Sequence, residues 1–252
     1  MIEISHVSKT YGGQRIIDDI SLTLKAGGLT SIIGPNGAGK STLLTMISRL
    51  VPVDRGTILV DGMDVSKTPG DKLARRLSIL RQENTVTSRL TVRELVTFGR
   101  YPYSKGRPIL EDKMHIDQAI HYLGLEKLED RFLDELSGGQ RQRAFVAMVI
   151  CQDTDYILLD EPLNNLDMKH SAAMMKLLRR AADELGKTIV TVLHDINFAS
   201  CYSDMIVAMR EGKIIASGTP ETIIQPDCLR AIYDLDIEVR EINNRHIAVY
   251  YS

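Results

Sequence analysis

The sequence predicts an α/β protein with a mainly parallel sheet, an N-terminal antiparallel β-subdomain and an inserted α-helical subdomain. Two short runs of apolar, aromatic or β-branched residues, at 156–159 and 188–193, are typical of buried strands. A helical pattern over 168–185, which ends at Gly186, separates them. Strands that alternate with helices in this way favour a parallel sheet.

The N-terminal part shows a different pattern, with strands close together in the chain. Residues 2–7 and 16–24 alternate like short strands on either side of a turn at Gly12-Gly13, and residues 57–60 form a further strand before Asp61-Gly62. A Gly-rich turn follows the apolar run at 29–33, and a helix is expected to start near Lys40. These short connections predict antiparallel pairing at the N-terminus.

Residues 85–154 are expected to form the helical insertion. Apolar residues recur at helical spacing from Val92, a second helix is predicted over 112–123, and Gly106-Arg107-Pro108 breaks the two. The core is then expected at 1–84 and 155–225. A C-terminal extension over 226–252 contains a hairpin centred on Asn243-Asn244.

Composition excludes several classes of protein. The 252 residues suit one large domain, and 31 basic against 33 acidic side chains leave a formal net charge of −2, which argues against nucleic acid as a partner. Three cysteines without a C-x-x-C pair disfavour a disulfide framework or a zinc site. Neither a signal peptide nor an apolar run of about 18 residues is apparent, so membrane attachment would need a partner.

The strongest single motif is a phosphate-binding loop that matches G-x-x-x-x-G-K-[ST] between a strand and a helix. Glycines let backbone N–H groups surround a phosphate, and the helix N-terminus adds a positive dipole. Lys40 can reach the β- and γ-phosphates, and the Ser41 hydroxyl can bind Mg²⁺. A chance Gly-rich turn is the disfavoured alternative. The predicted nucleotide-binding residues here are Gly34, Pro35, Asn36, Gly37, Ala38, Gly39, Lys40, Ser41 and Thr42.

A second candidate element is the pair of acids Asp160 and Glu161, which ends the buried strand at 156–159. Strand ends at one edge of a parallel sheet face the ligand. Asp160 is placed to hold Mg²⁺, and Glu161 is available to deprotonate the attacking water. By itself the pair could equally be a solvated strand end, but the phosphate loop about 120 residues upstream favours the catalytic role.

The segment Leu136-Ser137-Gly138-Gly139-Gln140 precedes an apolar helix. Locally, Ser137 is a helix cap, and the two glycines leave N–H groups exposed as an anion site. With this LSGGQ sequence the chain closely resembles the ABC ATPase family. The resemblance implies that Ser137, Gly138, Gly139 and Gln140 bind the γ-phosphate of ATP held by a second subunit. A homodimer would then enclose two Mg-ATP, so that ATP and Mg²⁺ are the expected cofactors.

The same resemblance assigns roles to four further residues. Tyr11 is implied to stack on adenine, Gln82 to sense Mg²⁺, Asp167 to lie in the loop that crosses the dimer axis, and His194 to contact the γ-phosphate. Local alternatives are a surface tyrosine, an ordinary loop glutamine, a helix N-cap for Asp167 and a structural histidine. The family's usual Ser-Ala-Leu-Asp is Asn-Asn-Leu-Asp at 164–167 here, which leaves the hydrogen bonds across the dimer open.

The cargo is suggested only by resemblance. Phe98-Gly99-Arg100-Tyr101-Pro102 resembles a segment of ATPases that serve ferric-siderophore, haem and cobalamin importers, and 160–170 is similar to those of catecholate-siderophore importers for enterobactin or petrobactin. The implied partners are permease subunits and, indirectly, a substrate-binding protein, at the cytoplasmic face of a bacterial membrane. The alternatives are a haem or cobalamin importer and a non-transport ABC ATPase.

Overall fold

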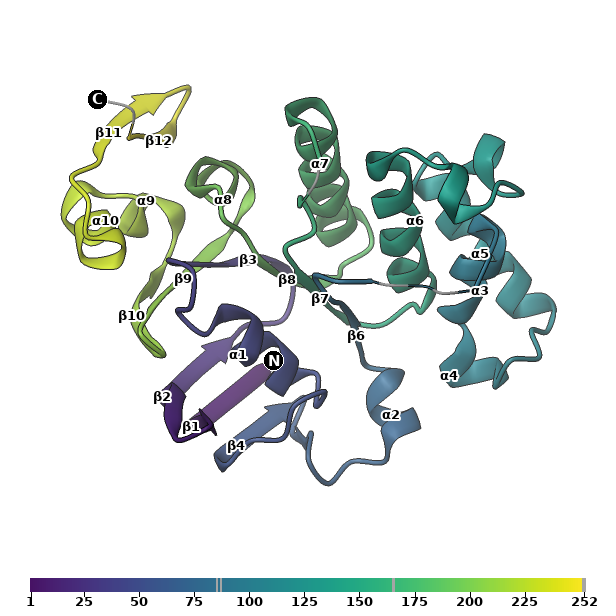
Figure 1. Cartoon of the computed structure of the whole chain (residues 1–252), viewed down its shortest axis with the longest axis horizontal. Coiled ribbons are helices and arrows are strands. Elements are labelled where there is room, and N and C mark those ends of the chain that lie inside the picture. Colours follow the sequence, from purple (N-terminus) through teal and green to yellow (C-terminus); the bar gives the residue numbers. More distant parts are fainter. Residues whose placement is uncertain (85, 87, 165, 251–252) are drawn as a thin grey trace. The chain divides into compact units, whose positions relative to one another are not determined.

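The computed structural model describes residues 1–84, 86, 88–164 and 166–250, which form two compact units (Figure 1). One unit consists of Met1–Thr68 and Leu178–Ser252, and the other of Pro69–Leu177. The helix α7 (Met168–Glu184) contributes residues to both. The second unit therefore contains the predicted helical insertion together with the flanking strands of that part of the chain.

The first unit begins with the predicted antiparallel sheet. Its strands are β1 (Ile2–Tyr11), β2 (Gln14–Leu24), β4 (Arg55–Val60) and β5 (Met63–Asp64), in the order β2-β1-β4-β5. Pairing of β1 with β2 extends from Ile2↔Leu24 to Tyr11↔Gln14, so both strands are longer than the alternation alone indicated. The turn at Gly12 and Gly13 is confirmed, since both have positive φ, at 54° and 83°.

The parallel part of the first unit is built on β3 (Gly28–Ile33), which pairs in parallel with β8 (Thr188–Val192) and β9 (Met205–Arg210). The strand β10 (Lys213–Gly218) pairs antiparallel with β9. All five residues of β8 and five of the six in β3 are buried, which explains why, apart from Ser31, the buried residues are apolar or β-branched. The helices α1 (Lys40–Ile47) and α8 (Ile196–Tyr202) follow β3 and β8.

The C-terminal extension contains more than the predicted hairpin. The short helix α9 (Pro220–Ile223) precedes it, and α10 (Pro226–Tyr233) comes before the strands β11 (Glu238–Ile242) and β12 (Arg245–Val249). Asn243 and Asn244 have φ of 51° and 60°, as a tight two-residue turn requires. Asn197 of α8 exchanges two hydrogen bonds with the Ala248 backbone of β12, at 3.1 and 2.8 Å. The hairpin is thus fixed to α8.

In the second unit, β6 (Leu77–Leu80) and β7 (Tyr156–Asp160) pair in parallel. The helix α2 (Gly70–Ala74) precedes β6. Between β6 and β7 the chain forms α3 (Val92–Phe98), α4 (Tyr101–Ser104), α5 (Leu110–Tyr122) and α6 (Gly138–Cys151), with the one-turn 3-10 helices η1 (Glu126–Leu128) and η2 (Leu133–Glu135). The buried faces of α3, α5 and α6 pack together, in teal in Figure 1. Thr91 and Glu94 form a reciprocal cap at the start of α3.

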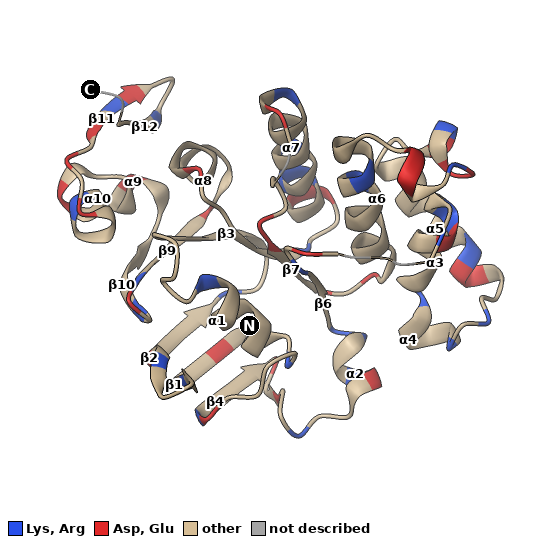
Figure 2. Cartoon of the chain, in the orientation of Figure 1, with Lys and Arg blue, Asp and Glu red and all other residues tan. Residues whose placement is uncertain are grey.

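Charged residues of both signs are interspersed along the helices and strands of each unit (Figure 2). This distribution fits the near-zero net charge and gives no continuous basic stripe on the elements drawn. Among the helices that the structure describes, none is long and apolar enough to cross a membrane.

Candidate functional site

The phosphate loop lies in the first unit, between β3 and α1. Gly34 has φ of 144°, and a Cβ on it would stand 2.0 Å from the Met209 carbonyl oxygen. Gly39 has φ of 96°, and its Cβ would come within 2.7 Å of Ile17 Cδ1. No other residue fits at these two positions without moving backbone or core. The predicted need for glycine therefore has two causes, backbone conformation and close packing.

Lys40 projects back along this loop. Its Nζ donates to the carbonyl oxygens of Gly34 at 2.8 Å and Pro35 at 2.9 Å, and the residue is only 5% exposed. Ser41 and Thr42, the next two residues of α1, are partly exposed. The loop thus holds an ammonium group and a hydroxyl at a helix N-terminus, which is the arrangement that binds phosphate groups.

Tyr11 and His194 lie in the same unit. Tyr11 ends β1 with 47% of its surface exposed, and Lys9 Nζ lies 5.3 Å from the centre of its ring, so one aromatic face is at the surface. His194 is exposed between the end of β8 and α8. Asp195 caps α8, because its Oδ1 accepts from the backbone N–H groups of Asn197 and Phe198. The cap fixes the chain immediately after His194.

Asp160 and Glu161 lie in the second unit, at the end of β7. Asp160 is 4% exposed and Glu161 9%. Glu161 has φ of 51°, in the left-handed region that non-glycine residues seldom adopt. Such a conformation costs on the order of 1–3 kcal/mol and persists only where the surrounding structure holds it, as it often does at active sites. The backbone therefore leaves the extended conformation of β7 at Glu161, directly after Asp160.

Two side-chain amides bind the Glu161 carboxylate. Gln82 donates through Nε2 to Glu161 Oε2 at 2.7 Å, and Asn164 Nδ2 donates to the same oxygen. The structure therefore brings together Gln82 and Glu161, which the sequence placed in the same site without indicating a contact. Asn164 was not predicted as a site residue. Its only signal was the amide at the position where the family usually has serine.

The remaining predicted elements of the second unit begin helices. Ser137 caps α6, since its Oγ accepts from Gln140 N at 3.3 Å while Gln140 Oε1 accepts from Ser137 N at 3.0 Å. Ser137 and Gly138 are exposed and Gly139 is partly exposed. Asp167 Oδ1 accepts from His170 N at 2.8 Å, so the predicted alternative of an N-cap is confirmed. Asn165, in the same predicted loop, lies outside the described residues.

A sequence profile with the description ABC transporter matches residues 17–164, a stretch that contains the phosphate loop, the two acids and the LSGGQ turn. The chain belongs to the ABC transporter family. As a member of this family it is an ATPase. The α/β fold with its mainly parallel sheet, N-terminal antiparallel sheet and helical segment is the fold of ABC cassettes, as predicted.

Sequence similarity to known proteins covers most or all of the chain. It is 56% identical over 252 residues to the petrobactin import ATP-binding protein YclP of Bacillus subtilis, with 100% of both chains covered. It is 40% identical over 230 residues to the ferric enterobactin transport ATP-binding protein FepC of Escherichia coli, covering 89% of this chain and 84% of that one. The solved ATP-binding cassette MJ0796, described as dimeric and bound to ADP and Pi, matches with a TM-score of 0.78 at 28% identity, covering 87% and 99% of the chains.

The donors available in this ABC ATPase suit Mg²⁺. The Ser41 hydroxyl, the Asp160 carboxylate and the Gln82 amide are all oxygen ligands, which this ion prefers. Gln82 donates its Nε2 to Glu161, and this leaves its amide oxygen as the group that can face a cation. The residues that the sequence assigned to the metal therefore have the right chemistry for it.

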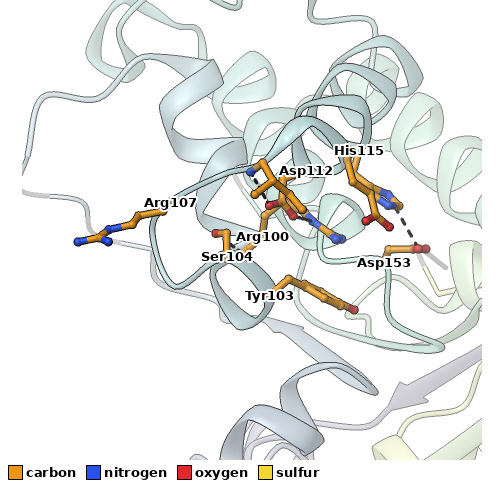
Figure 3. Close-up of a pocket in the computed structure, with 9 residues that line it drawn as sticks. Arg100, Tyr103, Ser104, Arg107, Asp112, His115 and Asp153 are labelled. Carbon is orange, nitrogen blue, oxygen red and sulfur yellow. Dashed lines mark hydrogen bonds and ion pairs between the residues drawn. The ribbon is translucent and has the colours of Figure 1, made fainter.

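Arg100 of the Phe98-Gly99-Arg100 segment lines a pocket of about 310 Å³ in the second unit of this ABC ATPase (Figure 3). Arg100 is buried there: its Nε donates to Asp112 Oδ1 at 2.9 Å and its Nη1 to the Cys151 carbonyl at 3.1 Å. Its guanidinium lies 3.9 Å from the centre of the Tyr103 ring. Arg100 thus connects α4 and α5 to the C-terminal end of α6, where the helix dipole also stabilises a cation.

This buried pair makes a testable contribution to stability. Both side chains are 4% exposed, so Asp112→Asn would leave the Arg100 charge buried without its partner. We expect the free energy of unfolding to fall by about 3–5 kcal/mol, measured by urea denaturation. The control is Glu184→Gln, which removes the exposed Arg180–Glu184 pair and should change it by about 0.3–0.5 kcal/mol. Equal effects of the two substitutions would contradict this assignment.

Proposed function

We propose that this ATPase works as a homodimer that binds two Mg-ATP and drives import of a ferric siderophore of the catecholate class through a membrane permease, at the cytoplasmic face of a bacterial membrane. The observation that carries the proposal is the likeness to YclP, named for petrobactin import, across the full length of both chains. The 40% identity to FepC, named for ferric enterobactin, points to the same class of cargo.

The chain's own geometry supports the dimer. The first turn of α6 presents the exposed Ser137 hydroxyl and the N–H groups of two glycines, which is an anion site at a helix N-terminus. The phosphate loop is a second anion site, with its own lysine. A homodimer that pairs each phosphate loop with the α6 turn of the other subunit uses both sites on each nucleotide, and the dimeric MJ0796 cassette at 28% identity is consistent with this pairing.

Each residue then has a defined task in hydrolysis. The phosphate-loop N–H groups and Lys40 bind the β- and γ-phosphates, while Tyr11 stacks on the adenine. Ser41, Asp160 and Gln82 hold Mg²⁺, which when bound neutralises the charge that develops on the phosphates. Glu161 accepts a proton from the attacking water, His194 binds the γ-phosphate, and Gln82 and Asn164 fix the carboxylate in position.

To drive a conformational change in the permease, ATP must bind the closed dimer more tightly than the open one. A change in population from 1:99 to 99:1 needs about 5.5 kcal/mol of differential affinity, which two nucleotides would share. Phe98 and Tyr101, 53% and 55% exposed, form the apolar surface we assign to permease contact. Tyr103 is not part of it, because it packs on Arg100.

Uptake by whole cells tests the cargo. A strain lacking the gene would be complemented with the wild-type chain, and uptake of radiolabelled iron would be measured from ferric petrobactin, ferric enterobactin, a ferric hydroxamate and haem, with labelled cobalamin in parallel. We expect restored uptake of at least one catecholate complex and of none of the other three. Restored uptake of haem or cobalamin alone would contradict the siderophore proposal while leaving the ATPase intact.

A further inference from the structure

The imidazole of His170 lies directly against the backbone of Gly139. A Cβ placed on Gly139 would stand 3.0 Å from His170 Cδ2, 3.1 Å from Cγ and 3.5 Å from Cβ. The first two separations are tighter than ordinary van der Waals contact, so a Cβ at position 139 would require the ring to move by a few tenths of an ångström. A neighbour in the same chain therefore favours glycine at this point of α6.

The opposite edge of the same ring is held by Asp167. His170 Nδ1 lies 2.7 Å from Asp167 Oδ1, and the backbone N–H of His170 donates to that oxygen at 2.8 Å. These two interactions, the backbone one first, hold the pKa of Asp167 below its usual value. The carboxylate is thus ionised at neutral pH and fixes the orientation of the ring that faces Gly139.

A second contact joins the same two segments. Gln142, one turn into α6, donates its Nε2 to the Pro162 carbonyl at 3.0 Å. Pro162 directly follows Glu161, and Asp167 and His170 lie a few residues further on. The first turns of α6 are therefore attached at two points to the segment 161–170. Of the two, the His170 contact is the one that reaches the turn with the exposed Ser137 and Gly138.

We propose that His170 is a positioning residue for ATP hydrolysis: it sets the first turn of α6, with Ser137 and Gly139, at a fixed position relative to Asp167. The proposal rests on the proposed function, in which that turn binds the γ-phosphate held by the partner subunit. A displacement of about 1 Å in such a group costs on the order of 10²-fold in rate. Binding of ATP to the phosphate loop of a single subunit does not involve His170.

Three substitutions separate the two contacts of the ring. Asparagine has the same Cγ, a donor close to the position of Nδ1 and an atom close to that of Cδ2, so His170→Asn keeps both contacts. Leucine keeps the shape without the donor, and alanine loses both. We expect kcat for ATP hydrolysis to fall roughly 10- to 100-fold in His170→Ala and His170→Leu and to stay within about threefold of wild type in His170→Asn.

The Kd for ATP, measured with monomeric protein by isothermal titration calorimetry, should be unchanged in all three variants. Lys169→Ala, at the exposed neighbouring position of α7, is the matched control and should keep the wild-type kcat. A His170→Asn enzyme as slow as His170→Ala, or a His170→Leu enzyme as fast as wild type, would overturn the role of the Asp167 bond. A wild-type kcat in His170→Ala would overturn the proposal entirely.

The contact itself can be tested without ATP. Gly139 has helical backbone geometry, so alanine there should raise Tm through helix propensity once space is available. We expect Gly139→Ala to raise the Tm of nucleotide-free protein in a His170→Ala background and to lower it, or leave it unchanged, beside the native His170. Equal shifts in both backgrounds would refute the contact. If the wild-type chain failed to hydrolyse ATP, the proposed function would fail. The Tm comparison of Gly139→Ala in the two backgrounds would still test the contact between His170 and Gly139.

Discussion

Replacement of Glu161 by glutamine is expected to lower the rate of ATP hydrolysis by about 10²- to 10⁴-fold while ATP binding is retained. Glutamine keeps the length of the side chain and an oxygen that can accept from Gln82 and Asn164, so the local structure survives. It cannot take a proton from water. Since closure needs ATP but reopening needs hydrolysis, the variant should also accumulate as a closed dimer.

Two measurements check this result: phosphate release in a single turnover, and sedimentation velocity with Mg-ATP. Asp130→Asn, at an exposed acid in the same unit, is the control and should hydrolyse ATP like the wild type. Hydrolysis at the wild-type rate in Glu161→Gln would remove Glu161 from the role of general base. A variant that stays monomeric with saturating Mg-ATP would argue against the dimer instead.

Replacement of Lys40 by alanine should weaken ATP binding roughly 10- to 100-fold, because a hydrogen bond to a charged group contributes about 1.5–3 kcal/mol. The affinity for ATP would be measured by isothermal titration calorimetry. Since Lys40 also donates to the carbonyls of Gly34 and Pro35, the loop loses internal contacts in this variant. Lys40→Gln, which restores a donor without the charge, separates the two contributions.

If the charge is what binds phosphate, Lys40→Gln and Lys40→Ala should lose similar affinity even where the glutamine variant regains thermal stability. The exposed Lys25→Ala, in the same unit, should leave affinity unchanged. An affinity close to wild type in both Lys40 variants would mean that the loop binds phosphate through its backbone alone.

Local patterns were sufficient for most of the fold. The phosphate loop, the turn at Gly12-Gly13 and the hairpin at Asn243-Asn244 are specified by residues that are adjacent in the chain, and each forms as predicted. The runs of apolar, aromatic or β-branched residues in β7 and β8 reflect complete burial of both strands. Strand ends were less predictable, since β1 and β2 continue through polar residues as long as backbone pairing is available.

The contacts that organise the site were not predictable from sequence, because they join residues far apart in the chain or depend on side-chain direction. Arg100 reaches the Cys151 carbonyl across 51 positions, and Gln82 reaches Glu161 across 79. His170 was seen only as part of a resemblance, and nothing in its spacing indicated a ring on Gly139. The helix α10 was missed because its eight residues follow directly on α9 in a segment interpreted as a hairpin.

The left-handed backbone at Glu161 sets folding and chemistry against each other at a single position. Stability alone would favour glycine or asparagine there, since both tolerate that conformation at lower cost. We infer that an acid is retained at this turn for its proposed role in ATP hydrolysis. With Glu161 in the proposed role of general base, a laboratory selection that scored only resistance to heat would favour replacement of this residue, and the most heat-stable variants would be inactive.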